Sequence, residues 1–193
     1  MIIIINCGYS SIEKLEELVD ISSDFQTFSL LDIDLEEIKS FQPIGIVLSH
    51  AHFSINEINP EQYISKIQEL YTLDLPILGI GVGHHLLGVA FGAQVSYQAY
   101  KNEVVEIGII ETAELFNKLP EVIHMVKDNA GTISIPPHFT LLANSDWSIN
   151  EAMKKIDEPI YGTQFILEVS GNHGAVIMEN FVDISQKYVA KQT

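Results

Sequence analysis

One stretch near the middle of the chain constrains the fold more than any other. Residues 76–88 read PILGIGVGHHLLG, an apolar run that ends in a glycine-rich turn and leads directly into a helical pattern. A buried strand of a parallel sheet passes into the following helix through such a tight turn. Because ligands bind beside the carboxyl ends of the strands in these folds, the turn is a candidate functional site.

The residues before this turn alternate between strand and helix patterns. Ser10 and Glu13 predict a capping box for the first helix, and Asp34 predicts an N-cap for the second. Three strand–helix units leading to a fourth strand indicate an α/β fold with a doubly wound, mostly parallel sheet flanked by helices. We expect strands at residues 2–6, 26–31, 44–48 and 76–80, with helices at 10–19, 35–40 and 60–71.

The pattern changes beyond Gly92, where short strand signals follow one another and helix signals are few. This half predicts antiparallel strands that extend the sheet, and a final helix that packs on it. No linker or repeat divides the chain, so we expect residues 1–193 to form one domain. The strands are expected at residues 104–110, 122–125, 139–143, 151–155 and 159–165, with helices near 113–117 and 175–188.

Composition excludes several classes of partner. The formal net charge is −16, and all ten basic residues are lysine. A chain with this charge and no arginine is unsuited to nucleic acid, where cationic side chains must replace the counterions of phosphate. Cys7 is the only cysteine, which favours a reducing, cytoplasmic location. No apolar run approaches the ~18 residues that would cross a membrane.

The turn closely resembles the nucleophile elbow of class I glutamine amidotransferases, which reads P-x-L-G-I-C-x-G-x-Q. Gly81 stands at the position of the nucleophilic cysteine, and His85 replaces the glutamine. The resemblance implies the flavodoxin-like α/β fold of that family.

Two further segments carry the same resemblance. Residues 162–168 read GTQFILE where the family has G-x-Q-F-H-P-E, so Ile166 replaces the histidine base and Glu168 keeps the position of the triad acid. Residues 49–52, SHAH, align with the S-G-G-P loop that helps to form the oxyanion hole, and both glycines are replaced. The resemblance therefore implies a degenerate catalytic triad.

Within this family the chain is most similar to the separate glutaminase subunit of archaeal GMP synthetase. That subunit carries an S-H-x-D motif, of which only Asp128 remains here. The similarity implies a synthetase-type partner subunit, and a homo-oligomer is the alternative.

The substitutions predict that glutamine is not hydrolysed. Covalent hydrolysis of an amide needs a nucleophile and a base, and neither Gly81 nor Ile166 can supply one. Loss of one triad member typically costs ~10⁴-fold in rate. Cys7 follows the first strand and does not match the elbow. Glycine at position 81 can still adopt the strained backbone of a nucleophile elbow.

Histidines have replaced the missing catalytic groups. His50 and His52 lie on one loop, while Gly83, His84 and His85 lie at the elbow, and the resemblance places all of them around one pocket near Glu168. Imidazoles beside a carboxylate suggest a metal site. However, adjacent residues at a helix start point about 100° apart, and a helix N-terminus repels cations. We therefore expect no metal or other cofactor, and histidines that bind an anionic small molecule or fill space.

Three classes of function stay open. The first is a catalytically silent amidotransferase-like protein that binds a small molecule or a partner and has a regulatory role. The second is an active enzyme, either an amidotransferase with another nucleophile or a metal-dependent hydrolase that uses His50, His52, His84 and His85. The third is a purely structural or interaction protein.

Overall fold

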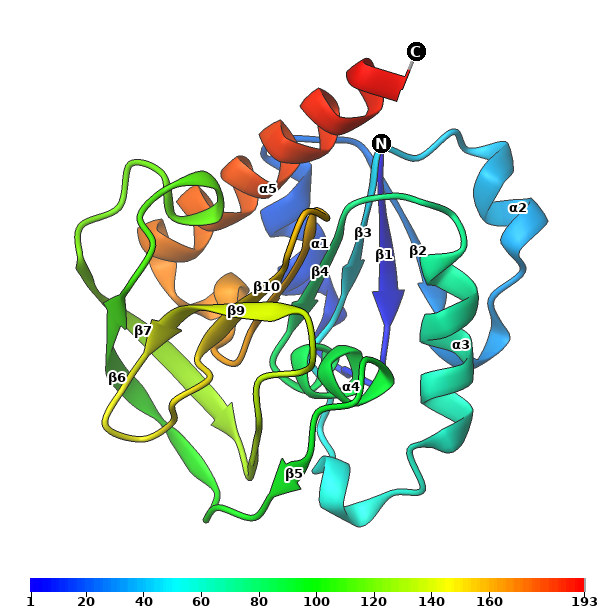
Figure 1. The fold of residues 1–193 in the computed structure, drawn as a ribbon. Coiled ribbons are helices and arrows are strands. Elements are labelled where there is room, and N and C mark those ends of the chain that lie inside the picture. The colour runs from blue at the N-terminus through cyan, green and yellow to red at the C-terminus, as the bar shows by residue number, and fades with distance from the viewer. Residues whose placement is uncertain (193) are drawn as a thin grey trace.

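A mixed sheet of nine strands forms the centre of the computed structural model, which describes residues 1–192 apart from the side chain of Asn56 (Figure 1). The first five strands of the sheet are mutually parallel. In sheet order they are β2 (Phe25–Ser29), β1 (Ile2–Asn6), β3 (Gly45–Leu48), β4 (Ile77–Ile80) and β11 (Ile160–Thr163).

Four antiparallel strands continue the sheet beyond β11. They are β10 (Ala152–Lys155), β9 (Phe139–Asn144), β6 (Lys101–Ile109) and β7 (Val122–Asn129), in that order. A separate small sheet pairs β5 (Val95–Ser96) with β8 (Thr132–Ile133). The predicted α/β architecture, with antiparallel strands added by the C-terminal half, is confirmed.

Helices cover both faces of the parallel half, where strand β1 is apolar on both sides. Ile2 and Ile4 belong to one core cluster, which also contains residues of α1 (Ile12–Asp20) and α5 (Gly171–Gln192). Ile3 and Ile5 belong to the other. That second cluster contains residues of α2 (Leu35–Ser40), α3 (Glu61–Tyr71) and α4 (Val82–Ala90). Such a strand, buried on both faces, is typical of a parallel sheet.

Two local predictions were wrong and one was confirmed. Helix α1 begins at Ile12 and has no side-chain cap, so the predicted capping box of Ser10 and Glu13 is absent. Residues 113–117 form only a 3-10 turn, η3 (Glu114–Phe116), in place of a helix. Asp34 does cap α2, where its Oδ1 accepts hydrogen bonds from the backbone N–H groups of Glu36 and Glu37.

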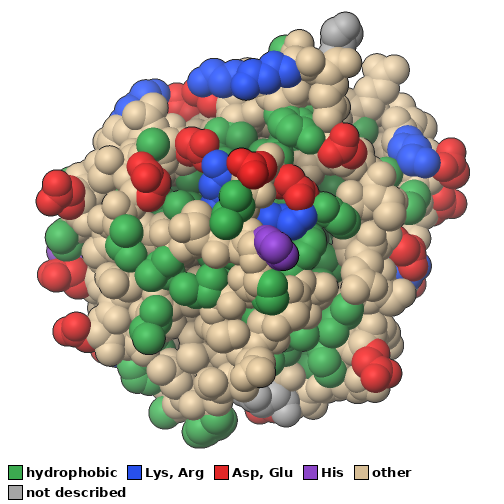
Figure 2. Space-filling view, in the orientation of Figure 1, with side chains coloured by type: hydrophobic (Ala, Val, Ile, Leu, Met, Phe, Trp, Pro, Cys, Tyr) green, Lys and Arg blue, Asp and Glu red, His purple; other side chains and the backbone are tan. Residues whose placement is uncertain are grey.

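The surface reflects the acidic composition. Figure 2 shows Asp and Glu side chains spread over the upper part and the edges of one face, with apolar side chains between them. A distributed charge of this kind favours solubility. Among residues 1–192, no helix has the length and apolar character needed to span a membrane.

Candidate functional site

The elbow between β4 and α4 keeps a strained backbone. Gly81 has φ 57° and ψ −114°, a backbone conformation that residues other than glycine rarely adopt. Its N–H donates to the carbonyl of Thr163 on β11 at 2.8 Å, and its carbonyl accepts from the N–H of His85 at 3.2 Å. Strain of this kind persists only where the surroundings enforce it, and it is common at functional sites.

The space above Gly81 is filled by other side chains. A Cβ atom added at Gly81 would lie 2.5 Å from Nδ1 of His50 and 2.6 Å from Cδ1 of Ile166. Both distances are far below van der Waals contact. The backbone N–H of Val82, the first residue of α4, donates to the same His50 Nδ1 at 3.3 Å. The imidazole of His50 is thus held directly over the turn.

Ile166 and Glu168 follow β11 at the edge of this site. Ile166 is buried and forms an isolated bridge with Val126 of β7, in which its N–H donates to the Val126 carbonyl at 2.8 Å. Both carboxyl oxygens of Glu168 are buried and have no hydrogen-bond partner in the described part of the chain. Burial raises the pKa of Glu168 to about 7, and its own backbone N–H, the charge of Lys14 and the hydroxyl of Tyr9 oppose this shift. Glu168 is therefore poised between its neutral and charged forms near neutral pH.

His50 and His52 form an aromatic cluster with Tyr9, which follows β1. The ring centroid of Tyr9 lies 5.2 Å from that of His50 and 5.0 Å from that of His52, and the two histidine rings are 5.9 Å apart. Burial is the main cause that lowers the pKa of His50 to about 4; the negative charge of Asp128 opposes this shift, and the neighbouring His52 adds to it. His50 is therefore neutral at physiological pH.

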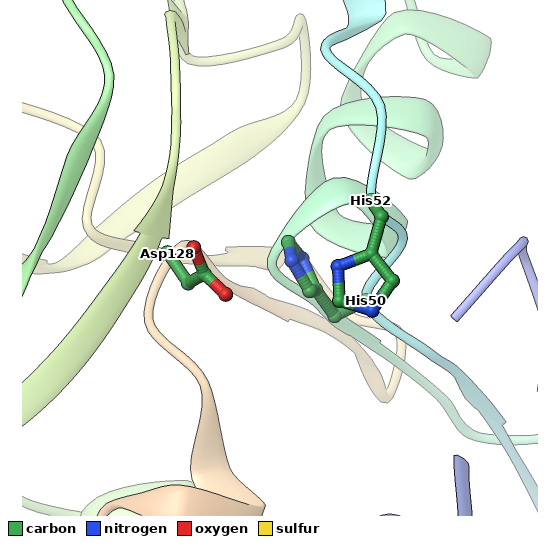
Figure 3. Close-up of side chains that lie close together, drawn as sticks. All are labelled: His50, His52 and Asp128. Carbon is green, nitrogen blue, oxygen red and sulfur yellow. The ribbon is translucent and has the colours of Figure 1, made fainter. Parts of the chain in front are cut away.

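A cavity of about 350 Å³ opens beside these two histidines. Figure 3 shows Asp128, at the end of β7, pointing across it toward both imidazoles. The cavity is lined by His50, Ala51, His52, Phe53, Ser54, Glu57, Tyr100, Asp128, Asn129 and Ala130. The structure thus places His50 and His52 in one cavity, whereas the resemblance had implied one pocket shared with Gly83, His84 and His85 near Glu168.

The other predicted ligand-binding residues do not line this cavity. His84 and His85 are fully buried in α4, and their ring nitrogens have no hydrogen-bond partner among residues 1–192. Burial lowers the pKa of His85 to about 3 and holds that of His84 well below its ordinary value. His84 covers Gly162, whose added Cβ would lie 2.4 Å from the imidazole Nδ1. An added Cβ at Gly83 would meet the carbonyl of Leu48 at 2.5 Å, so Gly83 allows α4 to pack closely against the end of β3.

Cys7 offers no replacement nucleophile. Its side chain is buried, and its thiol donates a weak hydrogen bond to the carbonyl of Ile5 at 3.7 Å. Burial raises the pKa of this thiol to about 12. The reactive thiolate is therefore absent at neutral pH.

Sequence reasoning missed two residues of the site. Tyr9 is one, and nothing in the sequence links it to the histidine loop. Asp128 is the other, although it is the surviving aspartate of the S-H-x-D motif. That motif was the signal that could have identified Asp128, because it marks a functional carboxylate in the family. Only the three-dimensional structure shows that the carboxylate of Asp128 faces His50 and His52.

A flavodoxin-like sheet with a strained elbow after a central strand defines the class I glutamine amidotransferase fold. The model of the family described as "Glutamine amidotransferase class-I" matches residues 3–184, so the chain belongs to this family, as its motifs predicted.

Particular relatives narrow the comparison. The chain is 38% identical over 153 residues to a glutamine-hydrolyzing GMP synthase subunit of Pyrococcus furiosus, a match that covers 78% of this chain and 80% of the relative. It is 34% identical over 158 residues to the corresponding subunit of Methanobrevibacter smithii, covering 80% of each. The solved structure of a putative GMP synthase subunit from Thermoplasma acidophilum is similar with a TM-score of 0.88 and 26% identity. That match covers 100% of this chain and 98% of the other.

Proposed function

We propose that this chain is an amidotransferase-like protein that does not hydrolyse glutamine, and that it acts by binding a small molecule or a partner at the former catalytic site. One observation carries the proposal. The volume that a nucleophilic side chain at position 81 would need is occupied by His50 and Ile166, and these are themselves replacements of family residues. Three altered positions are therefore packed against one another.

The chemistry of the site supports the same conclusion. Gly81 has no nucleophilic atom, Ile166 cannot accept a proton, and the thiol of Cys7 is buried and protonated. Triad members act as a unit, so the loss of two leaves little beyond residual binding effects. Of the three triad positions, only that of Glu168 keeps the family's residue type. Because no histidine is present for it to orient, Glu168 has no catalytic task.

The names of the relatives suggest the setting. They are subunits of a glutamine-hydrolyzing GMP synthase, so we propose that the macromolecular partner is a synthetase-type subunit and that the location is the cytoplasm. We also propose a regulatory role, in which this chain modulates an active relative or its synthetase. This role fits a chain that keeps the amidotransferase fold but lacks the residues for the reaction. We also propose that residues 1–193 form a single domain, as the sequence predicted.

Ammonia release from glutamine, measured at high protein concentration with and without a chelator, tests the proposal. The wild-type chain is expected to release none above buffer. Gly81→Cys alone is expected to stay inactive, because its Cβ would lie within 2.6 Å of His50 and Ile166. The matched variant combines Gly81→Cys with Ile166→His, His50→Gly and Ala51→Gly, which together restore nucleophile, base and loop. It is expected to gain measurable glutaminase activity.

Three results would overturn the proposal. Chelator-insensitive ammonia release by the wild-type chain would show that another nucleophile is active. Full activity of Gly81→Cys alone would show that His50 and Ile166 do not exclude a side chain at the elbow. Release that is lost on chelation would instead identify a metal-dependent hydrolase.

A further inference from the structure

Three side chains from two segments distant in sequence converge on the cavity beside the elbow. His50 and His52 lie on the loop after β3, and Asp128 lies near the end of β7 (Figure 3). Each offers one ligand atom, and these three atoms all lie within 4.8 Å of one another. Two imidazole nitrogens and a carboxylate oxygen form the ligand set that divalent transition metals prefer in proteins.

The charge of the cavity favours a cation. Its lining includes the carboxylates of Asp128 and Glu57 and no lysine. The N-terminus of α4 has a positive dipole, but the first helical N–H, that of Val82, is directed at His50 Nδ1. The carboxylates of Asp128 and Glu57 thus offset the positive dipole at the N-terminus of α4.

Neighbouring groups hold the three side chains in place. The Tyr100 hydroxyl donates a hydrogen bond to Oδ1 of Asp128, which leaves the second carboxylate oxygen free to ligate. The ring of Tyr9 packs against both imidazoles. Outer contacts of this kind orient the ligands in metal sites.

We propose that His50, His52 and Asp128 bind one divalent transition-metal ion, with Zn²⁺ as the best match to the ligand set. Three protein ligands leave a fourth tetrahedral position, which faces the 350 Å³ cavity and admits water or a small ligand. The sequence had directed attention to His84 and His85 as further ligands. Both are buried in α4, and the carboxylate of Asp128 completes the set in their place.

Binding requires small and specific movements. Ligand atoms around tetrahedral zinc are about 3.3 Å apart, given metal–ligand distances of about 2.0 Å. His52 is exposed and Asp128 is half-buried, and small rotations of these two side chains, within their contacts to Tyr9 and Tyr100, would bring the ligand atoms to that spacing. His50 accepts from Val82 through Nδ1, so ligation through its Nε2 moves the ring proton to Nδ1 and breaks that 3.3 Å hydrogen bond. The amide of Val82 therefore reports on occupancy.

Metal stoichiometry tests the site directly. Chelator-treated full-length protein is titrated with Zn²⁺, with Mg²⁺ as a comparison, by calorimetry and by equilibrium dialysis with elemental analysis. We expect one equivalent of Zn²⁺ per chain, no comparable binding of Mg²⁺, and a shift of the Val82 amide resonance. Loading with Co²⁺ is expected to give the intense visible absorption of a tetrahedral site.

Variants locate the ion. His52→Ala and Asp128→Asn are each expected to weaken Zn²⁺ binding by more than about 100-fold, beyond the range typical of outer contacts, and Tyr100→Phe by about 10-fold. His124→Ala removes an exposed histidine that lies 4.0 Å from Glu106, and as the matched control it is expected to leave affinity unchanged. Circular dichroism verifies folding. If a variant unfolds, the wild-type stoichiometry and cobalt spectrum decide alone.

Other results would overturn the site. These are the absence of stoichiometric Zn²⁺, unchanged affinity in both ligand variants, or an equal loss in His124→Ala. The inference goes beyond the proposed function and is independent of it, because metal binding is measured without glutamine. A wild-type chain that binds one Zn²⁺ but releases ammonia from glutamine contradicts only the proposed function, whereas a chain that releases no ammonia and binds no Zn²⁺ contradicts only the metal site.

Discussion

At the scale of single residues, Gly81 combines two constraints that substitutions can separate. Its φ of 57° disfavours any side chain, and its surroundings leave no room for one. Gly171 has a similar φ of 61°, but a Cβ added there would meet nothing within 4 Å. The surroundings of a Cβ at these two glycines are therefore very different.

We expect Gly171→Ala to lower the free energy of unfolding by about 1 kcal/mol, which is the backbone term alone. Gly81→Ala is expected to lower it by about 3 kcal/mol, because overpacking against His50 and Ile166 is added to the backbone strain. The double variant His50→Ala/Gly81→Ala should lose about 1 kcal/mol less than the sum of its single variants. Denaturant unfolding measures all four values. Equal losses at the two glycines would show that position 81 is not crowded.

Glu168 makes the stability of the chain depend on pH in an unusual direction. Its pKa is about 7 in the folded chain and 4.5 ordinarily, so between these values the folded state binds more protons. The free energy of unfolding therefore falls as pH rises from about 4.5 to 7 and stays low above 7.

Glu168→Gln removes this dependence. At pH 8 the variant is expected to be more stable than wild type by on the order of 2 kcal/mol, and at pH 4 the difference should vanish. Glu17→Gln, at an exposed position of α1, is the control and should change neither value. Thermal unfolding across this pH range provides the measurement. A variant that is less stable than wild type at pH 8 would mean that Glu168 is charged and favourably paired.

At the scale of elements, α4 shows where sequence reasoning succeeds and where it ends. The glycine-rich turn predicted the passage from strand to helix, because few other structures accommodate that spacing of apolar residues and glycines. The burial of His84 and His85 was not predictable, because all of residues 82–88 are buried. A helix enclosed on every side has no polar stripe from which to infer orientation.

Because α4 is enclosed, its buried histidines lower the free energy of unfolding at acidic pH. His85 has a pKa of about 3 in the folded chain and 6.5 ordinarily, so between these values the unfolded state binds more protons. The free energy of unfolding therefore decreases as pH falls below about 6.5. His85→Leu is expected to remove this loss and to gain about 2 kcal/mol relative to wild type between pH 7 and pH 5. His124→Leu at an exposed position is the control, and parallel pH profiles for His85→Leu and wild type would contradict the prediction.

At the scale of the whole molecule, a buried ion pair lies inside the antiparallel extension, and the backbone beside it contacts the parallel half. Lys127 of β7 donates to Oε1 of Glu151 at 2.7 Å, and both side chains are fully buried. The backbone of Glu151 also accepts from the N–H of Gln164, just after β11, at 2.8 Å. The alternation of strand and helix patterns predicted the parallel half of the sheet, and the succession of short strand signals predicted the antiparallel half. They could not predict this pair, because lysine and glutamate in strands normally mark an exposed face.

Removing one partner of this pair should be far worse than removing both. Lys127→Met leaves the carboxylate of Glu151 buried without its counter-charge and is expected to cost about 3–5 kcal/mol of unfolding free energy. Lys127→Met/Glu151→Leu leaves no buried charge at this position, so its stability should return to within about 2 kcal/mol of wild type. Lys39→Met breaks the 2.7 Å pair with Glu36 on exposed α2 and should cost less than about 0.5 kcal/mol. Denaturant unfolding of the four proteins separates the cases. A double variant as unstable as Lys127→Met would show that this pair stabilises the fold by more than mutual neutralisation, and that the hydrogen bond from Ser145 to Glu151 belongs to the same unit.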